Sequence, residues 1–196
     1  MDNAADLIKV LIVDDHPAVR AGLRSVLRHE PGLVPIGEAV TAREAMEKAG
    51  EEPDVVLADY HLPDEDGLVL CTRLKAQEPS TRVLIYSAYA GAGLAVPALV
   101  AGADGLVDKS SLGRHLFDAI RRVARGGHAF PEISPEHLRA AAERLAPEDV
   151  PVLGMLVDRT THEDIAATLG IEPWQLQARL LSMIGRLRVE TPVSAA

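Results

Sequence analysis

The sequence predicts an α/β fold in which a doubly wound, five-stranded parallel sheet is followed by a second, smaller all-α domain. Three observations lead to this prediction. Short apolar runs recur through the first 126 residues, segments with helical spacing separate these runs, and only helical patterns remain after residue 134. Strands that alternate with helices in this way form a parallel sheet that is covered on both faces.

Five apolar runs are expected to be the buried strands of the sheet: residues 8–13, 34–39, 55–58, 83–86 and 105–107. The helix after the first run is marked by Pro17, because proline lacks the N–H that the first turn of a helix leaves unpaired. Leu23 and Leu27 then follow at a four-residue step, as in a helix that packs on a sheet. Thr41 and Glu44 have the spacing of a capping box for the next helix.

The domain boundary is expected at Gly126-Gly127. A linker of residues 127–144 follows, with a short helix that starts at Ser134-Pro135. The all-α domain is expected over residues 145–189, with helical patterns at 147–158, 162–169 and 173–187. Gly170 occupies the place of a left-handed residue that ends a helix. Residues 190–196 are expected to be a disordered tail.

Composition limits the class of protein. Cys71 is the only cysteine and no signal peptide is evident at the N-terminus, so we expect a reducing, cytoplasmic setting. Residues 83–103 carry no charge and are long enough to cross a membrane, but Pro97 and three glycines favour a strand, a loop and a short helix. The net charge is −9, and no segment has the positive balance that is typical of nucleic-acid binders.

Polar residues follow four of the predicted strands where each strand ends: Asp14 and Asp15, Asp59, Ser87, and Lys109. Because ligands collect at the carboxyl ends of parallel strands, we expect these side chains to converge. Clustered carboxylates suit Mg²⁺, a carboxylate can be a covalent nucleophile toward phosphorus, and an ammonium group can hold a phosphoryl oxygen. The pattern therefore predicts a phosphoryl-accepting site around Asp59.

Three segments resemble the receiver domain of two-component response regulators of the NarL/FixJ family: VLIVDDHPAVRAGLRSVL (10–27), DVVLADYHLPDEDGL (54–68) and AGADGLVDKS (101–110). The resemblance covers about residues 8–125 and implies a flavodoxin-like receiver fold. It implies that a sensor histidine kinase phosphorylates Asp59, that Ser87 is the switch hydroxyl, and that Lys109 is the phosphate-binding lysine.

The same resemblance implies a Mg²⁺ ion bound by Asp15, Asp59 and the backbone carbonyl of His61, with Asp14 acting through a water molecule. It also implies a regulator rather than an enzyme, with at most slow loss of its own phosphate. A phosphatase that resembles the haloacid dehalogenases would need a second aspartate where His61 stands.

Two features depart from the family pattern. Leu106 stands three residues before Lys109, where many relatives carry an aromatic ring that moves inward on activation. Residues 90–100, AGAGLAVPALV, are uncharged, whereas relatives usually have polar residues there. Pro97 also restricts where a helix in this segment can begin.

Residues 163–180, EDIAATLGIEPWQLQARL, have helix-turn-helix spacing and resemble the LuxR-type output domain of the same family. In such domains the second helix of the motif enters the major groove of DNA. The resemblance makes four side chains candidate DNA contacts: Gln175, Gln177, Arg179 and Arg186. The domain is divergent and shortened, because relatives usually continue into a fourth helix that pairs two subunits.

Two functions therefore remain open. In the first, the protein is a phosphorylation-controlled transcription regulator that binds DNA, with homodimers formed through the receiver or the linker helix. In the second, it is a phosphorylation-controlled protein-binding regulator whose helix-turn-helix no longer binds DNA strongly. Residues 145–196 have a net charge of −3, which opposes phosphate contacts and favours the second, but the retained helix-turn-helix spacing makes the first our preferred interpretation. Its candidate contact surfaces are Trp174, Leu180, Leu181 and the apolar segment 88–101.

Overall fold

The computed structural model of the chain describes residues 7–111 and 113–188. Within these residues one sheet of five parallel strands is present, in the order β2-β1-β3-β4-β5. The strands are β1 (Ile8–Val13), β2 (Leu33–Ala39), β3 (Val55–Asp59), β4 (Arg82–Ser87) and β5 (Gly105–Asp108). The predicted five-stranded parallel sheet is confirmed. The expected tail, residues 190–196, lies outside the described part of the chain.

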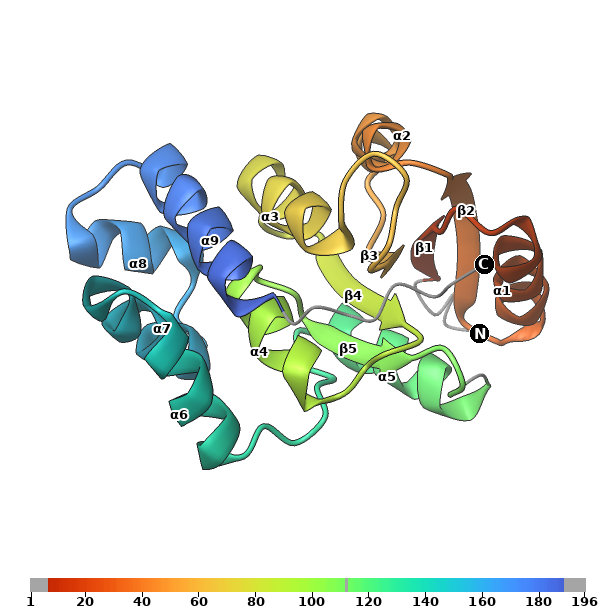
Figure 1. Cartoon of the computed structure of the whole chain (residues 1–196). Coiled ribbons are helices and arrows are strands. Elements are labelled where there is room, and N and C mark those ends of the chain that lie inside the picture. The colour runs from red at the N-terminus through yellow and green to blue at the C-terminus, as the bar shows by residue number, and fades with distance from the viewer. Residues whose placement is uncertain (1–6, 112, 189–196) are drawn as a thin grey trace.

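Helices cover both faces of the sheet (Figure 1). One face carries α1 (Pro17–His29) and α5 (Arg114–Ala124). The other carries α2 (Ala42–Lys48), followed by the short turn η1 (Ala49–Glu51), α3 (Gly67–Gln77) and α4 (Ala92–Val100). Strand residues serve the two layers in alternation: Val10 and Ile12 pack with α1 and α5, whereas Leu11 and Val13 pack in the opposite layer. This alternation explains why every strand reads as an apolar run.

The second domain is helical, as predicted: α6 (Pro135–Arg144), η2 (Pro147–Asp149), α7 (Val150–Val157), α8 (His162–Leu169) and α9 (Pro173–Leu187). Thr161 caps α8 by accepting a hydrogen bond from the backbone N–H of Asp164 at 3.1 Å. Gly170 ends α8 in the left-handed region, with a φ of 64°. The helix-turn-helix spacing in the sequence therefore corresponds to α8 and α9.

The segment between the domains is attached to the sheet. Ala129 lies beside β5, where its N–H donates to Asp104 O at 2.9 Å and its carbonyl accepts from Leu106 N at 2.9 Å. Gly105 permits this approach, because a Cβ atom there would lie 2.6 Å from the carbonyl oxygen of Ala129. The start of the expected linker is thus anchored to the edge of the sheet by backbone pairing.

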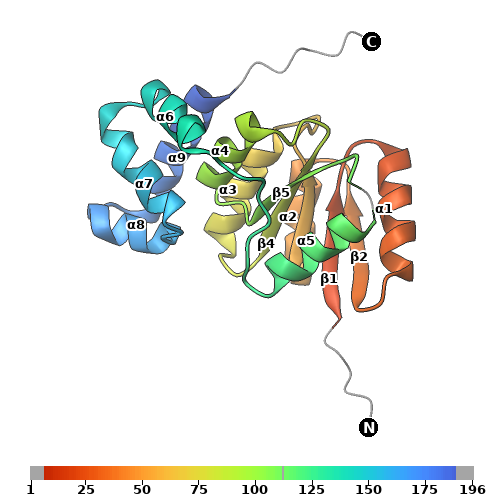
Figure 2. The ribbon, with the colours of Figure 1, turned by 90° about the horizontal axis from the view of Figure 1, so that it is seen from below.

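The two domains pack side by side (Figures 1 and 2). Helix α9 lies against α3 and α4, and α6 and α7 also contact α4. One hydrophobic cluster runs from the α3–α4 layer of the sheet into the core of the second domain, and it includes Val96 and Leu99 on one side and Leu180 and Ile184 on the other. The two helical layers therefore share a continuous apolar core.

This packing accounts for the uncharged helix α4. Ala95, Val96, Ala98, Leu99 and Val100 are all buried, and the second domain is what contacts this helix from outside the sheet. Of segment 88–101, a candidate surface for a foreign partner, residues 95–101 are thus covered by the chain itself, whereas Tyr89 before them is exposed. Pro97 lies inside α4 rather than at its start, where it leaves one backbone carbonyl of the helix unpaired. No helix among the described residues is long and apolar enough to span a membrane.

Candidate functional site

The predicted polar residues converge at the carboxyl edge of the sheet. Asp14 follows β1, Asp59 and Ser87 are the last residues of β3 and β4, and Lys109 follows β5. The parallel register brings Asp59 opposite Tyr86 and Ser87 opposite Asp108. Asp14, Asp59 and Ser87 are each at most 4% exposed. The strand order, with β1 and β3 as neighbours, is what places the first two carboxylates together.

Lys109 is the electrostatic centre of this cluster. Its Nζ lies 2.7 Å from Asp14 Oδ2 and 2.7 Å from Asp59 Oδ2. Its backbone is fixed on both sides: its N–H donates to Ser87 O at 2.9 Å, and its carbonyl accepts from the hydroxyl of Tyr86 at 3.1 Å. One ammonium group therefore separates two buried carboxylates that would otherwise repel each other.

The charges of the pair follow from these contacts. Burial alone would lower the pKa of Lys109, but its hydrogen bonds to Asp14 and Asp59 outweigh burial and raise the pKa above its usual value. Lys109 is therefore protonated at neutral pH. Burial raises the pKa of Asp59, and the hydrogen bond from Lys109 opposes this rise. The lysine thus favours the carboxylate form of Asp59, which is the form that can act as a nucleophile.

Asp15 and His16 complete an acidic cluster. Asp14, Asp15, His16 and Asp59 each offer one ligand atom, and these atoms lie within 4.8 Å of one another. Asp15 Oδ1 is buried and has no hydrogen bond within the protein, although His16 Nδ1 lies 2.6 Å away. Because His16 is exposed, its contact with this oxygen does not prevent a cation from binding there. The donor set, dominated by oxygen, is of the kind that holds Mg²⁺.

The loop between β3 and α3 is held tightly against Asp59. The N–H of Gly67 donates to Tyr60 O at 2.7 Å, and His61 and Asp66 form an antiparallel bridge across the loop. A Cβ atom on Gly67 would lie 2.1 Å from the carbonyl oxygen of Asp59, so only glycine fits there. This turn fixes the backbone at His61, whereas the His61 side chain is exposed and lies outside the cluster.

Ser87 faces its own loop. The Ser87 hydroxyl oxygen accepts a hydrogen bond from Tyr89 N at 3.1 Å. Among the described residues, no hydrogen bond joins this hydroxyl to the side chain of Asp59 or Lys109. Leu106 is 4% exposed and packs in the α3–α4 layer. The hydroxyl therefore belongs to the β4–α4 loop, directly before the helix that contacts the second domain.

The four candidate DNA contacts on α9 are not equally free. Gln175 accepts from Glu172 N at 2.9 Å as part of the N-terminal capping box of α9, and Gln177 lines a cavity between the domains. Arg179 lies 2.6 Å from Asp149 Oδ1, which orients it toward η2. Arg186 is exposed. Sequence reasoning missed the partner of Arg179, because Asp149 lies 30 positions away.

The sequence also gave no signal for a contact between the domains beside the acidic cluster. Arg188, directly after α9, forms an ion pair with Asp66 at the start of α3. The Asp66 side chain also caps α3 through the N–H groups of Leu68 and Val69, at 3.0 and 2.9 Å. The output helix is thus joined to the loop that follows Asp59.

The chain matches a known family over this region. Residues 10–121 match the family model described as the response regulator receiver domain. The fold, the acidic cluster and this match agree, and the chain belongs to the response regulators of two-component signalling. The relatives are regulators rather than enzymes by their names.

The likeness to known proteins extends beyond the receiver domain. The DNA-binding transcriptional activator DevR/DosR of Mycobacterium tuberculosis is 31% identical, with 97% of this chain and 93% of the relative covered. A solved LuxR-family response regulator from Aurantimonas sp. SI85-9A1 is 34% identical, with a TM-score of 0.61 over 70% of this chain and 96% of that one. RcsB of Salmonella enterica serovar Typhimurium, solved on a promoter with the phosphomimetic BeF3⁻, is 22% identical, with a TM-score of 0.62 over 95% and 94%, and shows the fold alone.

Proposed function

We propose that this response regulator accepts a phosphoryl group on Asp59 from a sensor histidine kinase. The observation that carries the proposal is the position of Lys109 Nζ, 2.7 Å from both Asp14 and Asp59. In the transfer, a carboxylate oxygen of Asp59 bonds to phosphorus while the phosphorus–nitrogen bond of the donor histidine breaks. Lys109 then balances charge on the phosphoryl oxygens, and Ser87 turns its hydroxyl toward them. Loss of the phosphate by hydrolysis is expected to be slow.

Mg²⁺ fits the acidic cluster. Asp15, Asp59 and the backbone carbonyl of His61 would hold the ion directly, with Asp14 acting through a water molecule. The buried Oδ1 of Asp15, which the exposed His16 approaches without forming a hydrogen bond, supports this assignment. When bound, the ion would neutralise charge on the transferring phosphoryl group. The residues of the chain supply what remains: a nucleophile, a fixed ammonium group and a rigid backbone turn.

The test is labelling of the full chain by a radioactive small-molecule phosphodonor in the presence of Mg²⁺. Asp59→Asn keeps the shape of the side chain and removes the nucleophile, so we expect no labelling. Lys109→Ala should reduce labelling strongly, whereas Glu47→Gln, an acidic residue on α2 outside the cluster, should leave it unchanged. Full labelling of Asp59→Asn contradicts the proposal.

We further propose that the output is control of transcription, with α8 and α9 as a DNA-binding helix-turn-helix in cytoplasmic homodimers. The name of the relative DevR/DosR, a DNA-binding transcriptional activator, supports this role. In the present arrangement the α9 residues Leu180 and Ile184 belong to the apolar core shared with α4, and Gln177 faces the cavity beside α3. DNA binding therefore requires the second domain to leave the receiver, and phosphorylation of Asp59 would favour that release.

A protein-binding output remains the second candidate, because Arg179 is engaged with Asp149 and residues 145–196 carry a net charge of −3. Gel shifts on genomic fragments at several salt concentrations separate the two. Sequence-specific binding by the phosphorylated chain, together with dimer formation measured by solution mass, supports transcriptional control. Absence of DNA binding at low salt supports the protein-binding alternative.

A further inference from the structure

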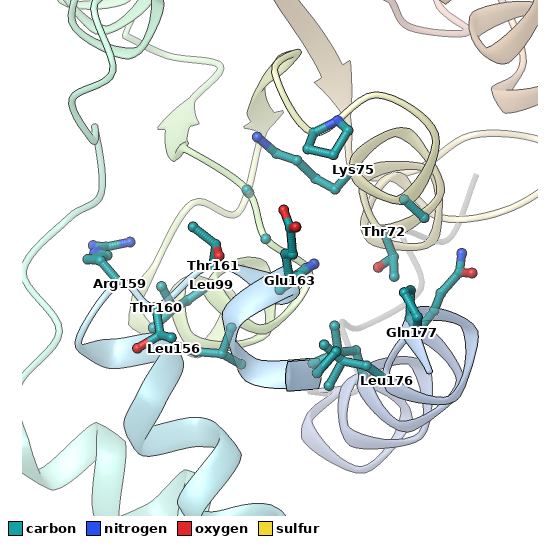
Figure 3. Close-up of a pocket in the computed structure, with 18 of the residues that line it drawn as sticks. Thr72, Lys75, Leu99, Leu156, Arg159, Thr160, Thr161, Glu163, Leu176 and Gln177 are labelled. Atoms are coloured by element: carbon teal, nitrogen blue, oxygen red, sulfur yellow. The ribbon is translucent and has the colours of Figure 1, made fainter. Parts of the chain in front are cut away.

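A cavity of about 730 Å³ lies between the two domains and is separate from the acidic cluster. Thr72 and Lys75 of α3 line one side, and Leu176 and Gln177 of α9 line the other (Figure 3). Its size and its place at a domain boundary are those of small-molecule sites. Exposed residues at its edge, such as Thr161 and Glu163, leave it open to solvent.

Two histidines leave polar atoms unsatisfied at this cavity. Three buried side-chain polar atoms of the described residues have no hydrogen-bond partner: Asp15 Oδ1 in the acidic cluster, His128 Nδ1 and His162 Nε2. Both histidines line the cavity. Buried polar atoms are almost always paired, so these two ring nitrogens mark an incompletely satisfied part of the domain contact. Both nitrogens are themselves inaccessible to solvent, and His162 Nε2 lies close to Gly102, so the rings rather than these two atoms line the cavity.

The cavity has an excess of positive charge. Lys75 and Arg82 both pair with Asp104, at 2.6 and 3.0 Å, so two cations share one carboxylate. Burial, then Lys75, lowers the pKa of His162 to about 4, and burial, then Arg159, lowers the pKa of His128. Glu163 is the opposing charge, and it is exposed and screened by solvent. An anion in the cavity relieves this excess.

Arg159 supplies the free cation. Its guanidinium makes no ion pair or hydrogen bond within residues 7–111 and 113–188, and it lies over the ring of Phe130, 5.0 Å from the centroid. Its backbone is left-handed, with a φ of 64°, in the turn that ends α7, where Thr160 N donates to Met155 O at 2.9 Å. Glycine is favoured at such a position, and another residue costs about 1 kcal/mol. The chain keeps an arginine where glycine would be more stable.

The rest of the wall is apolar and comes from both domains. Leu99 belongs to the receiver, and Leu156, Leu176 and Leu180 belong to the output domain. We propose that this cavity binds a small organic anion with an apolar body, whose charged group is held by Arg159 beside the rings of His128 and His162. Since both domains form the wall, a bound anion stabilises their contact and opposes release of α9.

The test uses calorimetry on the full, unphosphorylated chain with three probes. Benzenesulfonate has both a charge and an apolar ring, benzenesulfonamide is its neutral counterpart, and sulfate is an anion without the ring. We expect benzenesulfonate to bind in the millimolar range or tighter, at least about tenfold more tightly than either control probe. Nuclear magnetic resonance of the histidine rings should show His128 and His162 shifting on binding.

Arg159→Gly is the matching variant, because it relaxes the left-handed backbone and removes only the cation. It should keep the melting temperature within a few degrees and weaken benzenesulfonate binding at least about tenfold. Glu52→Gly is its control: Glu52 has the other left-handed non-glycine backbone in the described chain, with a φ of 53°, and lies outside the cavity. It should leave binding unchanged.

Four results would overturn the proposal. Equal binding of sulfate indicates only a basic surface, and equal binding of benzenesulfonamide indicates an apolar cavity without anion recognition. Unchanged binding in Arg159→Gly places the anion elsewhere. If calorimetry detects no heat of binding and the histidine resonances do not shift, the cavity binds no such anion and water is the partner of the two rings. None of these results depends on phosphorylation of Asp59, so failure here is distinct from failure of the proposed function.

Discussion

Arg188 forms an ion pair with Asp66, and this pair connects helix α9 to the loop that follows Asp59. Asp66 is seven positions after Asp59 in sequence, but the loop folds back so that their neighbours are hydrogen-bonded. The N–H of Gly67 donates to Tyr60 O at 2.7 Å. A change at Asp59 that moves the turn therefore acts on the contact between the domains without an aromatic residue at position 106.

Loss of this ion pair should open the domain contact slightly. Arg188 is half exposed, so the pair contributes about 0.2–1 kcal/mol, and its loss increases the open population up to about fivefold. We expect Asp66→Asn, which keeps the cap of α3, and Arg188→Gln to speed hydrogen exchange of the α4 amides by that factor. The double variant should add nothing further, because both changes break one interaction.

Arg73→Gln is the matched control for this experiment. Arg73 also lies on α3 and forms an exposed ion pair, but its partner Glu65 belongs to the receiver. Its loss should leave α4 exchange unchanged. Equal acceleration in Arg73→Gln, or additive effects in the double variant, contradicts a specific role for Arg188 and Asp66.

Gly67→Ala should disturb the loop between β3 and α3. The added Cβ would lie 2.1 Å from the carbonyl oxygen of Asp59, so the backbone must move, at a cost of about 2 kcal/mol in the free energy of unfolding. Phosphodonor labelling should slow as well, because Asp59 is displaced. Gly22→Ala is the control: nothing lies within 4 Å of its added Cβ in α1, and it should stabilise by about 0.5–1 kcal/mol. Urea unfolding and labelling rates measure both, and a neutral Gly67→Ala contradicts the packing.

Cys71 should be chemically silent in the folded chain. It is fully buried on α3, its thiol donates to Ala101 O at 3.4 Å, and burial raises its pKa to about 12. At pH 8 we expect reaction with an aromatic disulfide reagent to be roughly a thousandfold slower than in urea. Rapid stoichiometric reaction of the folded protein contradicts the packing of α3 against the end of α4.

Much of the fold and of the acidic cluster was predictable, because local patterns determine both. Asp14, Asp59 and Ser87 were identified as strand ends by short apolar runs, and parallel strands bring such ends together. Thr161 and Gly170 likewise marked the ends of α8 through cap chemistry that involves only nearby residues. Their roles in phosphoryl transfer and switching remain proposals.

The contact between the domains was not predictable, because it depends on residues far apart in sequence. An apolar run such as residues 90–100 indicates a buried segment, but it does not identify what buries it. In the structure the second domain of the same chain packs against this segment. The left-handed backbone of Arg159 has no sequence signal either, since glycine is the residue that usually marks it. The position of Pro97 inside α4 was missed because burial of the helix outweighs one lost hydrogen bond.

His162 should make stability depend on pH below neutrality. Its pKa is lowered to about 4, mainly by burial and then by Lys75, and it lies against Gly102 in the turn before β5. The folded chain keeps the ring neutral while the unfolded chain protonates it near pH 6.5. The contribution of the neutral ring to the free energy of unfolding is therefore complete above pH 6.5 and is lost as pH falls toward 4, by about 2 kcal/mol at pH 5.

Urea unfolding between pH 7 and 5 should show that much less loss of stability for His162→Gln than for the unchanged chain. His115→Gln, which removes an exposed histidine on α5, should follow the unchanged chain. Parallel curves for all three proteins would mean that His162 is hydrated and titrates normally, and that the two domains do not pack around it.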